Sequence, residues 1–196
     1  LGLVGMLVGQ ICKAAGCRVF GLELRPERVE LARELGIVAF WDEGVLEDAV
    51  KGESGGADAV IITAATESNR PIEQAPRYLR KRGRVVVVGD VGLKVPRRPY
   101  YFGEHEIRFS CSYGPGRYER AYEERGVGYE LEHVRWDERR NMEAYLRLVA
   151  DGSVNVERLV DFEAPVRDAL RVYERLEAGE VMGAVIRYEG GKEWAK

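Results

Sequence analysis

Histidine and cysteine are scarce in this sequence of 196 residues, and their scarcity excludes several kinds of site. The two histidines, His105 and His133, have no cysteine or carboxylate at ligand spacing, so neither predicts a metal site. The cysteines Cys12, Cys17 and Cys111 are odd in number, and their spacing matches neither a disulfide framework nor a zinc cage. We therefore expect reduced, structural thiols. No serine, cysteine or histidine arrangement suggests a nucleophile with its base.

Long apolar runs and a surplus of one charge are also lacking. No stretch approaches the roughly 18 apolar residues of a membrane span, and no basic-then-apolar leader opens the chain. The formal net charge of -3 does not supply the basic excess that nucleic-acid binding needs, and the basic cluster within 77–84 is interpreted as the solvated end of a helix. We predict a cytoplasmic protein with a small-molecule substrate and with neither nucleic acid nor membrane as partner.

Hydrophobic residues make up 45% of the chain, which is enough for one globular core. Helices are predicted at 4–15, 26–35, 43–50, 71–80, 137–150 and 166–177, and strands at 17–24, 37–40, 57–64, 84–88, 107–113 and 183–188. Residues 114–132 show no period, which indicates an irregular surface excursion. Strands alternating with helices predict an α/β fold with a parallel sheet covered on both faces.

A glycine turn opens the chain. Gly2 and Gly5 match the last part of a G-x-G-x-x-G turn, whose first glycine and preceding strand would lie before residue 1. One glycine lets the backbone approach a pyrophosphate and the other lets the helix pack closely, while the helix N-terminus offers free N–H groups. An ordinary tight turn is the alternative. We expect a Rossmann-type, doubly wound sheet that lacks its first strand.

An acidic residue supports the same interpretation. Glu23 ends the next predicted strand, about 20 residues after the turn, where a carboxylate accepts the adenosine ribose hydroxyls. The carboxylate also repels a 2′-phosphate, which favours NAD over NADP, although Arg25 and Arg28 nearby moderate that preference. A solvated strand end is the alternative for Glu23.

Small residues follow two of the predicted strands. Thr63-Ala64-Ala65-Thr66 and Gly89-Asp90-Val91-Gly92 both stand just past the carboxyl end of an apolar strand, where ligands bind in open α/β sheets. They are therefore candidate walls of a cofactor crevice. The alternative is that small residues suit tight strand-to-helix turns.

These residues resemble the nucleotide-binding domain of the zinc-type, medium-chain alcohol dehydrogenases. The resemblance covers nearly the whole chain and rests on Gly2-Leu3-Val4-Gly5, on Gly16-Cys17-Arg18-Val19 leading to Glu23 and Pro26-Glu27-Arg28, on Ala57-Asp58-Ala59-Val60, and on Arg82-Gly83-Arg84 before a valine strand. It implies that Leu3, Val4 and Gly5 hold the pyrophosphate and that Glu23 and Arg28 hold the ribose. It also implies a lining for the nicotinamide carboxamide, made of Val88, Gly89, Asp90, Cys111, Ser112 and Tyr113.

The resemblance also implies what lies outside these residues. The zinc ligands and proton-relay groups of that family belong to an upstream domain, so no catalytic or metal-binding residue is named in this chain. We expect residues 1–136 to form the dinucleotide-binding domain and residues 137–196 to pack back on it or on the catalytic domain. The chain alone is expected to be inactive and poorly stable. Association of identical chains through the last sheet strand is implied by the family alone.

A narrower resemblance rests on Ser110-Cys111-Ser112-Tyr113-Gly114-Pro115-Gly116-Arg117-Tyr118, Val134-Arg135-Trp136 and Asn141-Met142-Glu143-Ala144. It is to a branch in which this half is fused to a second, sugar-dehydrogenase-like half, often in the setting of surface polysaccharide synthesis. The predicted parent is thus an oxidoreductase that moves hydride between a nicotinamide and an alcohol, polyol, sugar or carbonyl.

Two other functions stay open at this point. A methyltransferase that uses S-adenosylmethionine also joins a glycine loop to an acid at the end of its second strand, although its sheet closes with an antiparallel hairpin that is not predicted here. A non-catalytic module that senses the dinucleotide would equally lack catalytic groups.

Overall fold

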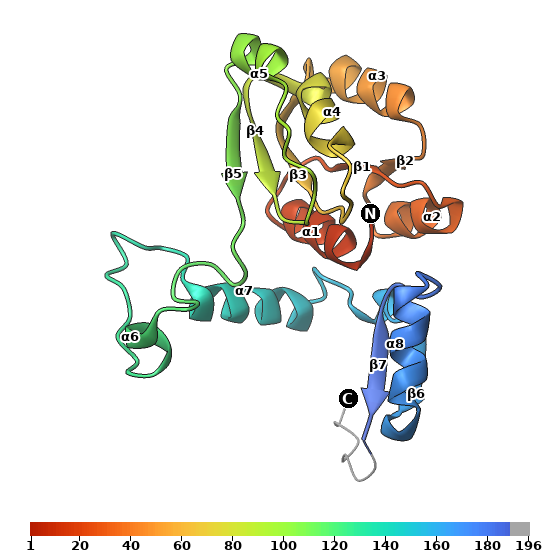
Figure 1. Cartoon of the computed structure of the whole chain (residues 1–196), viewed down its shortest axis with the longest axis vertical. Coiled ribbons are helices and arrows are strands. Elements are labelled where there is room, and N and C mark those ends of the chain that lie inside the picture. Colours follow the sequence, from red (N-terminus) through yellow and green to blue (C-terminus); the bar gives the residue numbers. More distant parts are fainter. Residues whose placement is uncertain (189–196) are drawn as a thin grey trace.

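The computed structural model describes residues 1–188. Its helices and strands are, in chain order, α1 (Leu3–Ala14), β1 (Phe20–Leu22), α2 (Pro26–Glu34), β2 (Val38–Phe40), α3 (Glu43–Ser54), β3 (Ala57–Ile62), α4 (Arg70–Tyr78), β4 (Leu79–Val87), α5 (Arg97–Gly103), β5 (Glu106–Phe109), α6 (Arg120–Glu123), α7 (Glu138–Ala150), β6 (Phe162–Pro165), α8 (Ala169–Glu177) and β7 (Ala184–Arg187). The paired strands are parallel and alternate with helices (Figure 1). The predicted α/β fold class is confirmed.

The parallel sheet is interrupted between β1 and β3. Among the described residues, β1 pairs only with β2, whereas β3 pairs with β4 and β4 with β5. The inner edges of β1 and β3 therefore have no strand partner. The Leu1 amino group donates a hydrogen bond of 3.0 Å to the Leu22 carbonyl on the β1 side. The break stands where the sequence predicts a Rossmann sheet to lack its first strand.

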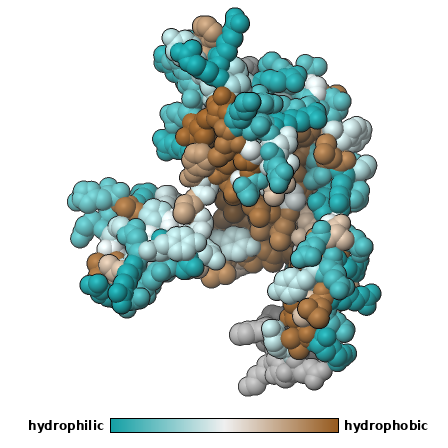
Figure 2. Space-filling model, viewed as in Figure 1, coloured by the Kyte–Doolittle hydropathy of each residue, from teal (hydrophilic) through white to brown (hydrophobic). Residues whose placement is uncertain are grey.

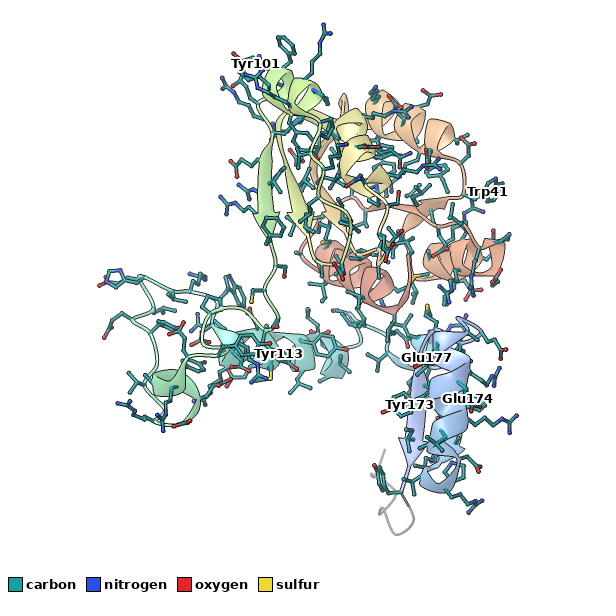
Figure 3. The ribbon with its side chains drawn as sticks, viewed as in Figure 1. Trp41, Tyr101, Tyr113, Tyr173, Glu174 and Glu177 are labelled. Atoms are coloured by element: carbon teal, nitrogen blue, oxygen red, sulfur yellow. The ribbon has the colours of Figure 1, made fainter. Side chains whose placement is uncertain are left out.

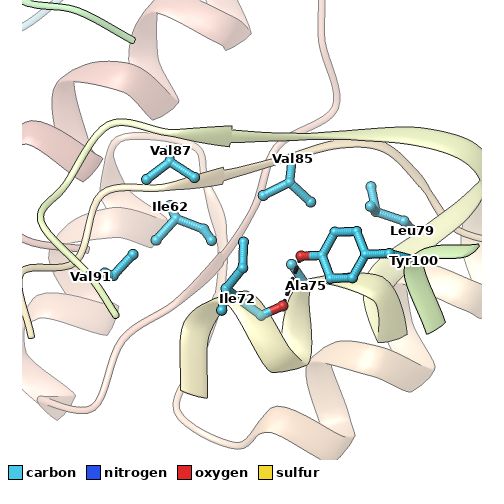
Figure 4. Packing of buried hydrophobic residues seen from close by; sticks show 8 residues of the cluster. All are labelled: Ile62, Ile72, Ala75, Leu79, Val85, Val87, Val91 and Tyr100. Carbon is cyan, nitrogen blue, oxygen red and sulfur yellow. Dashed lines mark hydrogen bonds between the residues drawn. The ribbon is translucent and has the colours of Figure 1, made fainter. Parts of the chain in front are cut away.

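One cluster of buried side chains joins β3 and β4 to α4 and α5 (Figure 4). Its members are Ile62, Ile72, Ala75, Leu79, Val85, Val87, Val91 and Tyr100. The Tyr100 hydroxyl donates a buried hydrogen bond of 2.8 Å to the Ile72 carbonyl, and burial raises the pKa of Tyr100 to about 12. The phenol therefore keeps its proton and fixes α5 against α4.

We expect Tyr100→Phe to lower the free energy of unfolding by about 1 kcal/mol, because the Ile72 carbonyl would lose a buried partner. Urea denaturation followed by circular dichroism measures the change. Tyr101→Phe is the matched control, since that ring is 61% exposed, and it should stay within about 0.5 kcal/mol of the parent. Equal effects of the two substitutions would show that the hydrogen bond contributes nothing.

A second cluster joins the start of the chain to a segment after α7. Met6, Val29, Ala32, Ile37 and Ala39 pack with Leu159. The backbone N–H of Asn155 donates 2.7 Å to the buried Gln10 side chain. Residues 154–159 therefore return to α1.

The elements after β5 are less buried. Helix α7 contains no buried residue within the described chain, and α8 packs on the pair formed by β6 and β7. Figure 1 shows this small unit standing away from the main sheet. The predicted division at 136/137 stays a prediction, and residues 189–196 of its second segment lie outside the described residues.

The interpretation of the basic cluster at 77–84 as a helix end is wrong for most of its members. Strand β4 begins at Leu79, so the cluster after Arg77 lies in the strand. Its cations pair with carboxylates of the neighbouring segments: Arg80 with Asp58, Lys81 and Arg82 with Glu104, and Arg84 with Glu106. These ion pairs accompany the strand conformation of the basic residues, which the sequence pattern did not predict.

Other differences concern short elements. Helix α5 and strand β6 were not predicted, and β5 ends at Phe109 instead of Tyr113. In the described part of the chain, no helix has the length and apolar character needed to cross a membrane.

Candidate cofactor site

The start of α1 is open to a ligand. Gly2 is the N-cap residue in an extended conformation, so no side chain caps the helix, and its first turn holds no acidic residue. A Cβ built on Gly2 would meet no described atom within 4 Å. The N–H groups of the first turn have no partner within a helix, and they carry the positive end of its dipole. This end of α1 can therefore accept an anion.

Gly5 brings α1 close to the end of β3. A Cβ on Gly5 would lie 2.9 Å from the Thr63 hydroxyl oxygen, which is tighter than normal packing. The glycine thus sets the distance between the helix and the strand, which is the packing role predicted for it. Two predicted site residues from different parts of the sequence are side by side here.

Glu23 is buried at the carboxyl end of β1, with only 8% of its surface exposed, so the alternative of a solvated strand end is wrong. One carboxylate oxygen accepts from the backbone N–H of Leu24 (2.7 Å) and of Arg25 (3.0 Å). The other lies 2.8 Å from the Leu1 amino nitrogen. Burial alone would raise the pKa of Glu23, but these hydrogen bonds and the nearby positive charge outweigh it and lower that pKa. The group is therefore a carboxylate at neutral pH.

The loops after β3 and β4 are held together. The N–H groups of Val88 and Gly89 donate to the Ile62 carbonyl at 2.9 and 3.0 Å, and that of Thr66 donates to Asp90 at 2.8 Å. A Cβ on Gly89 would overlap the Ala64 carbonyl oxygen. Beside this contact lies a hollow of about 410 Å³ lined by residues 65–67 and 90–92. The structure thus brings together the two small-residue segments predicted as crevice walls.

Cys111, Ser112 and Tyr113 lie beyond β5, not in it. Ser112 adopts a positive φ of 39°, its hydroxyl is 3.2 Å from that of Tyr118, and Asn141 donates 2.8 Å to the Tyr113 carbonyl. Figure 3 shows Tyr113 beside the start of α7. These contacts join the segment to the excursion and to α7, and none of them reaches the loops after β3 and β4.

Two further residues follow Glu23 in the sequence. Arg28, a predicted ribose contact, is half-buried in the first turn of α2. Leu24 was not singled out from the sequence, yet 76% of this apolar side chain is exposed next to the buried carboxylate. Its position directly after Glu23 was the signal available in the sequence.

Apolar surface accompanies the site. Figure 2 shows hydrophobic residues gathered over the middle of the molecule, where Figure 1 places β4 and α1. Leu3, Val4 and Val88 are exposed large apolar residues of these elements or directly beside them. Exposed apolar surface next to polar groups is typical of ligand sites.

Metal-binding groups are a separate question. Within residues 1–188, no group of three or more histidine, cysteine or acidic side chains is arranged to hold a metal ion. The described residues therefore offer no zinc site of their own.

The parallel α/β fold and the glycine turn at the N-terminus of α1 define a Rossmann-type nucleotide-binding domain. A family model described as "Zinc-binding dehydrogenase" matches residues 4–125, and the chain belongs to that family. The predicted resemblance is thereby confirmed at the level of the family. The fusion to a second dehydrogenase half stays a prediction.

Curated relatives match the same region. Alcohol dehydrogenase 1 of Caenorhabditis elegans is 30% identical over 170 residues, which are 82% of this chain and 47% of that protein. The alcohol dehydrogenase of Geobacillus stearothermophilus is 26% identical over 192 residues, 95% of this chain and 48% of that protein. The chain thus spans about half the length of these relatives.

Solved structures agree on the fold. An alcohol dehydrogenase zinc-binding domain protein from Burkholderia ambifaria has a TM-score of 0.71 at 20% identity and covers 95% of this chain and 46% of its own. A zinc-binding dehydrogenase from Sinorhizobium meliloti bound to NADP has a TM-score of 0.63 at 22% identity, with 87% and 45% covered. At these identities the likeness concerns the fold alone.

Proposed function

We propose that this chain binds the nicotinamide dinucleotide of a dehydrogenase that transfers hydride between the cofactor and an alcohol or carbonyl. The main observation behind this proposal is that an uncapped helix N-terminus at Gly2 is combined with a buried carboxylate, Glu23, at the end of the neighbouring strand. Membership of the zinc-binding dehydrogenase family supports the same function and argues against the methyltransferase alternative.

The two ends of the site suit the two parts of a dinucleotide. The pyrophosphate would receive the N–H groups of Leu3, Val4 and Gly5, because Gly2 leaves the approach open. Glu23 would accept a ribose hydroxyl, since a carboxylate has about four acceptor positions and the backbone N–H groups of Leu24 and Arg25 use two of them. Arg28 would assist at the ribose edge, and Leu24 would offer an apolar surface to the adenine.

The far end of the crevice would hold the nicotinamide. When bound, that ring supplies the hydride chemistry. Thr63 and Ala64 would form one wall, and Val88, Gly89 and Asp90 the other, because their loops are hydrogen-bonded together. Cys111, Ser112 and Tyr113 are proposed to join them, although their contacts are to the excursion. These residues position the ring and exclude water.

We further propose NAD in preference to NADP. Glu23 is negatively charged and buried, so a 2′-phosphate next to it would meet charge repulsion at low solvation. Arg25, the nearest cation in sequence, already donates to the Gly179 carbonyl at 2.5 Å. Zinc and acid–base groups are proposed to come from residues outside this domain, and residues 137–196 to pack on it or on a catalytic domain.

Calorimetric titration of the full-length protein with NADH, NADPH and S-adenosylmethionine tests the proposal. We expect NADH to bind more tightly than NADPH. Binding of S-adenosylmethionine, or no binding of any nicotinamide at millimolar concentration, would contradict it. Turnover of an alcohol with NAD would separate the enzyme from a sensor that only binds the dinucleotide.

Gly2→Ala provides a sharper test of the pyrophosphate position. The added methyl group meets no described atom, so the free energy of unfolding should stay within about 0.5 kcal/mol of the parent. It would point into the space assigned to the pyrophosphate, and NADH affinity should fall about tenfold, which corresponds to about 1.4 kcal/mol. Gly128→Ala, also in open space but in the excursion, is the control that should change neither quantity. Unchanged NADH affinity in Gly2→Ala would place the pyrophosphate elsewhere.

A further inference from the structure

The C-terminal end of α1, away from the proposed cofactor site, brings two cysteines together. Gly16 has a positive φ of 86°, and its N–H donates 2.9 Å to the Lys13 carbonyl. The N–H of Cys17 donates 3.0 Å to the Cys12 carbonyl. These two hydrogen bonds define a Schellman motif, in which the chain turns back over the last turn of the helix.

In a Schellman motif, the residue after the left-handed glycine typically contacts the side chain of the residue whose carbonyl it caps. Here those two residues are Cys17 and Cys12. Cys17 is exposed and Cys12 is half-buried, and both are free thiols. Burial raises the pKa of the Cys12 thiol, and the neighbouring Cys17 raises it further.

We propose that Cys12 and Cys17 are a thiol–disulfide exchange site, which takes low-molecular-weight disulfides such as oxidised glutathione and closes an intramolecular disulfide. The backbone hydrogen bond from Cys17 to Cys12 holds the two residues side by side, and a disulfide can close only between residues whose backbones are close. The site is separate from Cys111, which lies beyond β5 and contacts the excursion.

The exchange proceeds in two displacements. The exposed Cys17 thiolate attacks one sulfur of the small disulfide, which forms a mixed disulfide and releases one small thiolate. The Cys12 thiolate then attacks the Cys17 sulfur, which closes the protein disulfide and releases the second small thiolate. Two protein thiols are oxidised, the small disulfide is reduced to two thiols, and these take up the two protons that the cysteines lose.

The position at a helix C-terminus sets the chemical character of the site. The negative end of the helix dipole opposes a thiolate there, in contrast to the reactive thiols found at helix N-termini. A dithiol whose thiolate is not stabilised gives a disulfide of low oxidising power. Because the pKa of the Cys12 thiol is raised, we expect the closing displacement to be slow at neutral pH and faster as pH rises, and the exchange to yield a persistent disulfide.

The test incubates the full chain with oxidised glutathione and measures free thiols and intact mass. We expect Cys12 and Cys17 to lose their thiols together with a loss of two hydrogen masses, and any retained glutathione to map to the exposed Cys111 alone. Cys111→Ser, the matched control, should close the same disulfide. Cys12→Ser should instead stop at a glutathione adduct, which peptide mapping would locate on Cys17.

Three results would overturn the proposal. They are a parent protein that keeps all its thiols, a parent that accumulates the glutathione adduct on Cys17, and a disulfide that involves Cys111. Because Cys17 is exposed, Cys17→Ser keeps the fold testable. In that variant, Cys12 should react with oxidised glutathione more slowly than Cys17 does in the parent, because the Cys12 thiol is half-buried.

Discussion

Replacing Glu23 by alanine should weaken NADH binding by roughly 10- to 100-fold, because a hydrogen bond to a charged acceptor contributes about 1.5–3 kcal/mol. The carboxylate is buried and held by the backbone N–H groups of Leu24 and Arg25, so it is already oriented before a ligand arrives. Calorimetry with NADH measures the loss. NADPH affinity should stay equal or rise, since the repelling charge is gone, and the ratio of the two affinities should therefore shift by at least as much as the NADH affinity.

Glu27→Ala is the matched control for this experiment. It removes an equal charge from the exposed first turn of α2 and should leave both affinities unchanged. Glu23→Gln tests the charge separately, because it keeps an acceptor oxygen while it removes the repulsion. Since the backbone N–H groups of Arg25 and Leu24 lower the pKa of Glu23, the preference for NADH should be constant across neutral pH and decline only in acid, where the group takes up a proton. An Ala variant that binds NADH like the parent would remove the basis of the proposed site.

The sequence predicted the elements whose pattern is local. The apolar spacing of α1, the proline at the start of α2 and the valine run in β4 each determine their element without reference to the rest of the chain. The glycine turn and Glu23 were selected because a dinucleotide site requires residues of these types at this spacing, and their role in binding stays a prediction.

What the sequence did not predict depends on contacts between distant segments. The start of β4 is a run of basic residues that takes strand form beside Asp58, Glu104 and Glu106. The burial of Glu23 could not be predicted from the sequence either, because a carboxylate at a strand end is more often solvated.

The excursion after β5 illustrates the same limit. It has no period, yet Tyr122 and Tyr129 stack with ring centroids 5.5 Å apart, and the Tyr122 hydroxyl accepts from the backbone N–H of Arg139 in α7. Arg117 lies over the rings of Tyr113 and Tyr118. An irregular sequence is therefore ordered by aromatic contacts, and it shifts Tyr113 away from the strand end assigned to it by resemblance.

The second large effect concerns Gly89. We expect Gly89→Ala to lower the free energy of unfolding by about 2–3 kcal/mol, because its methyl group would overlap the carbonyl oxygen of Ala64 and neither backbone can yield cheaply. The loops after β3 and β4 would separate, and the hydrogen bonds from Val88 and Gly89 to the Ile62 carbonyl would lengthen. Urea denaturation measures the stability, and NADH titration of the folded variant should show weaker binding as well, since both crevice walls move.

Gly52→Ala is the control that separates this overlap from the general effect of adding a methyl group. Gly52 lies inside α3 with no atom within 4 Å of a new Cβ, and alanine is favoured over glycine in a helix by about 1 kcal/mol. Its free energy of unfolding should therefore rise while that of Gly89→Ala falls. If Gly89→Ala unfolds like the parent, the close approach of the two loops is not what holds the crevice walls, and the nicotinamide end of the site would have to be placed by other residues.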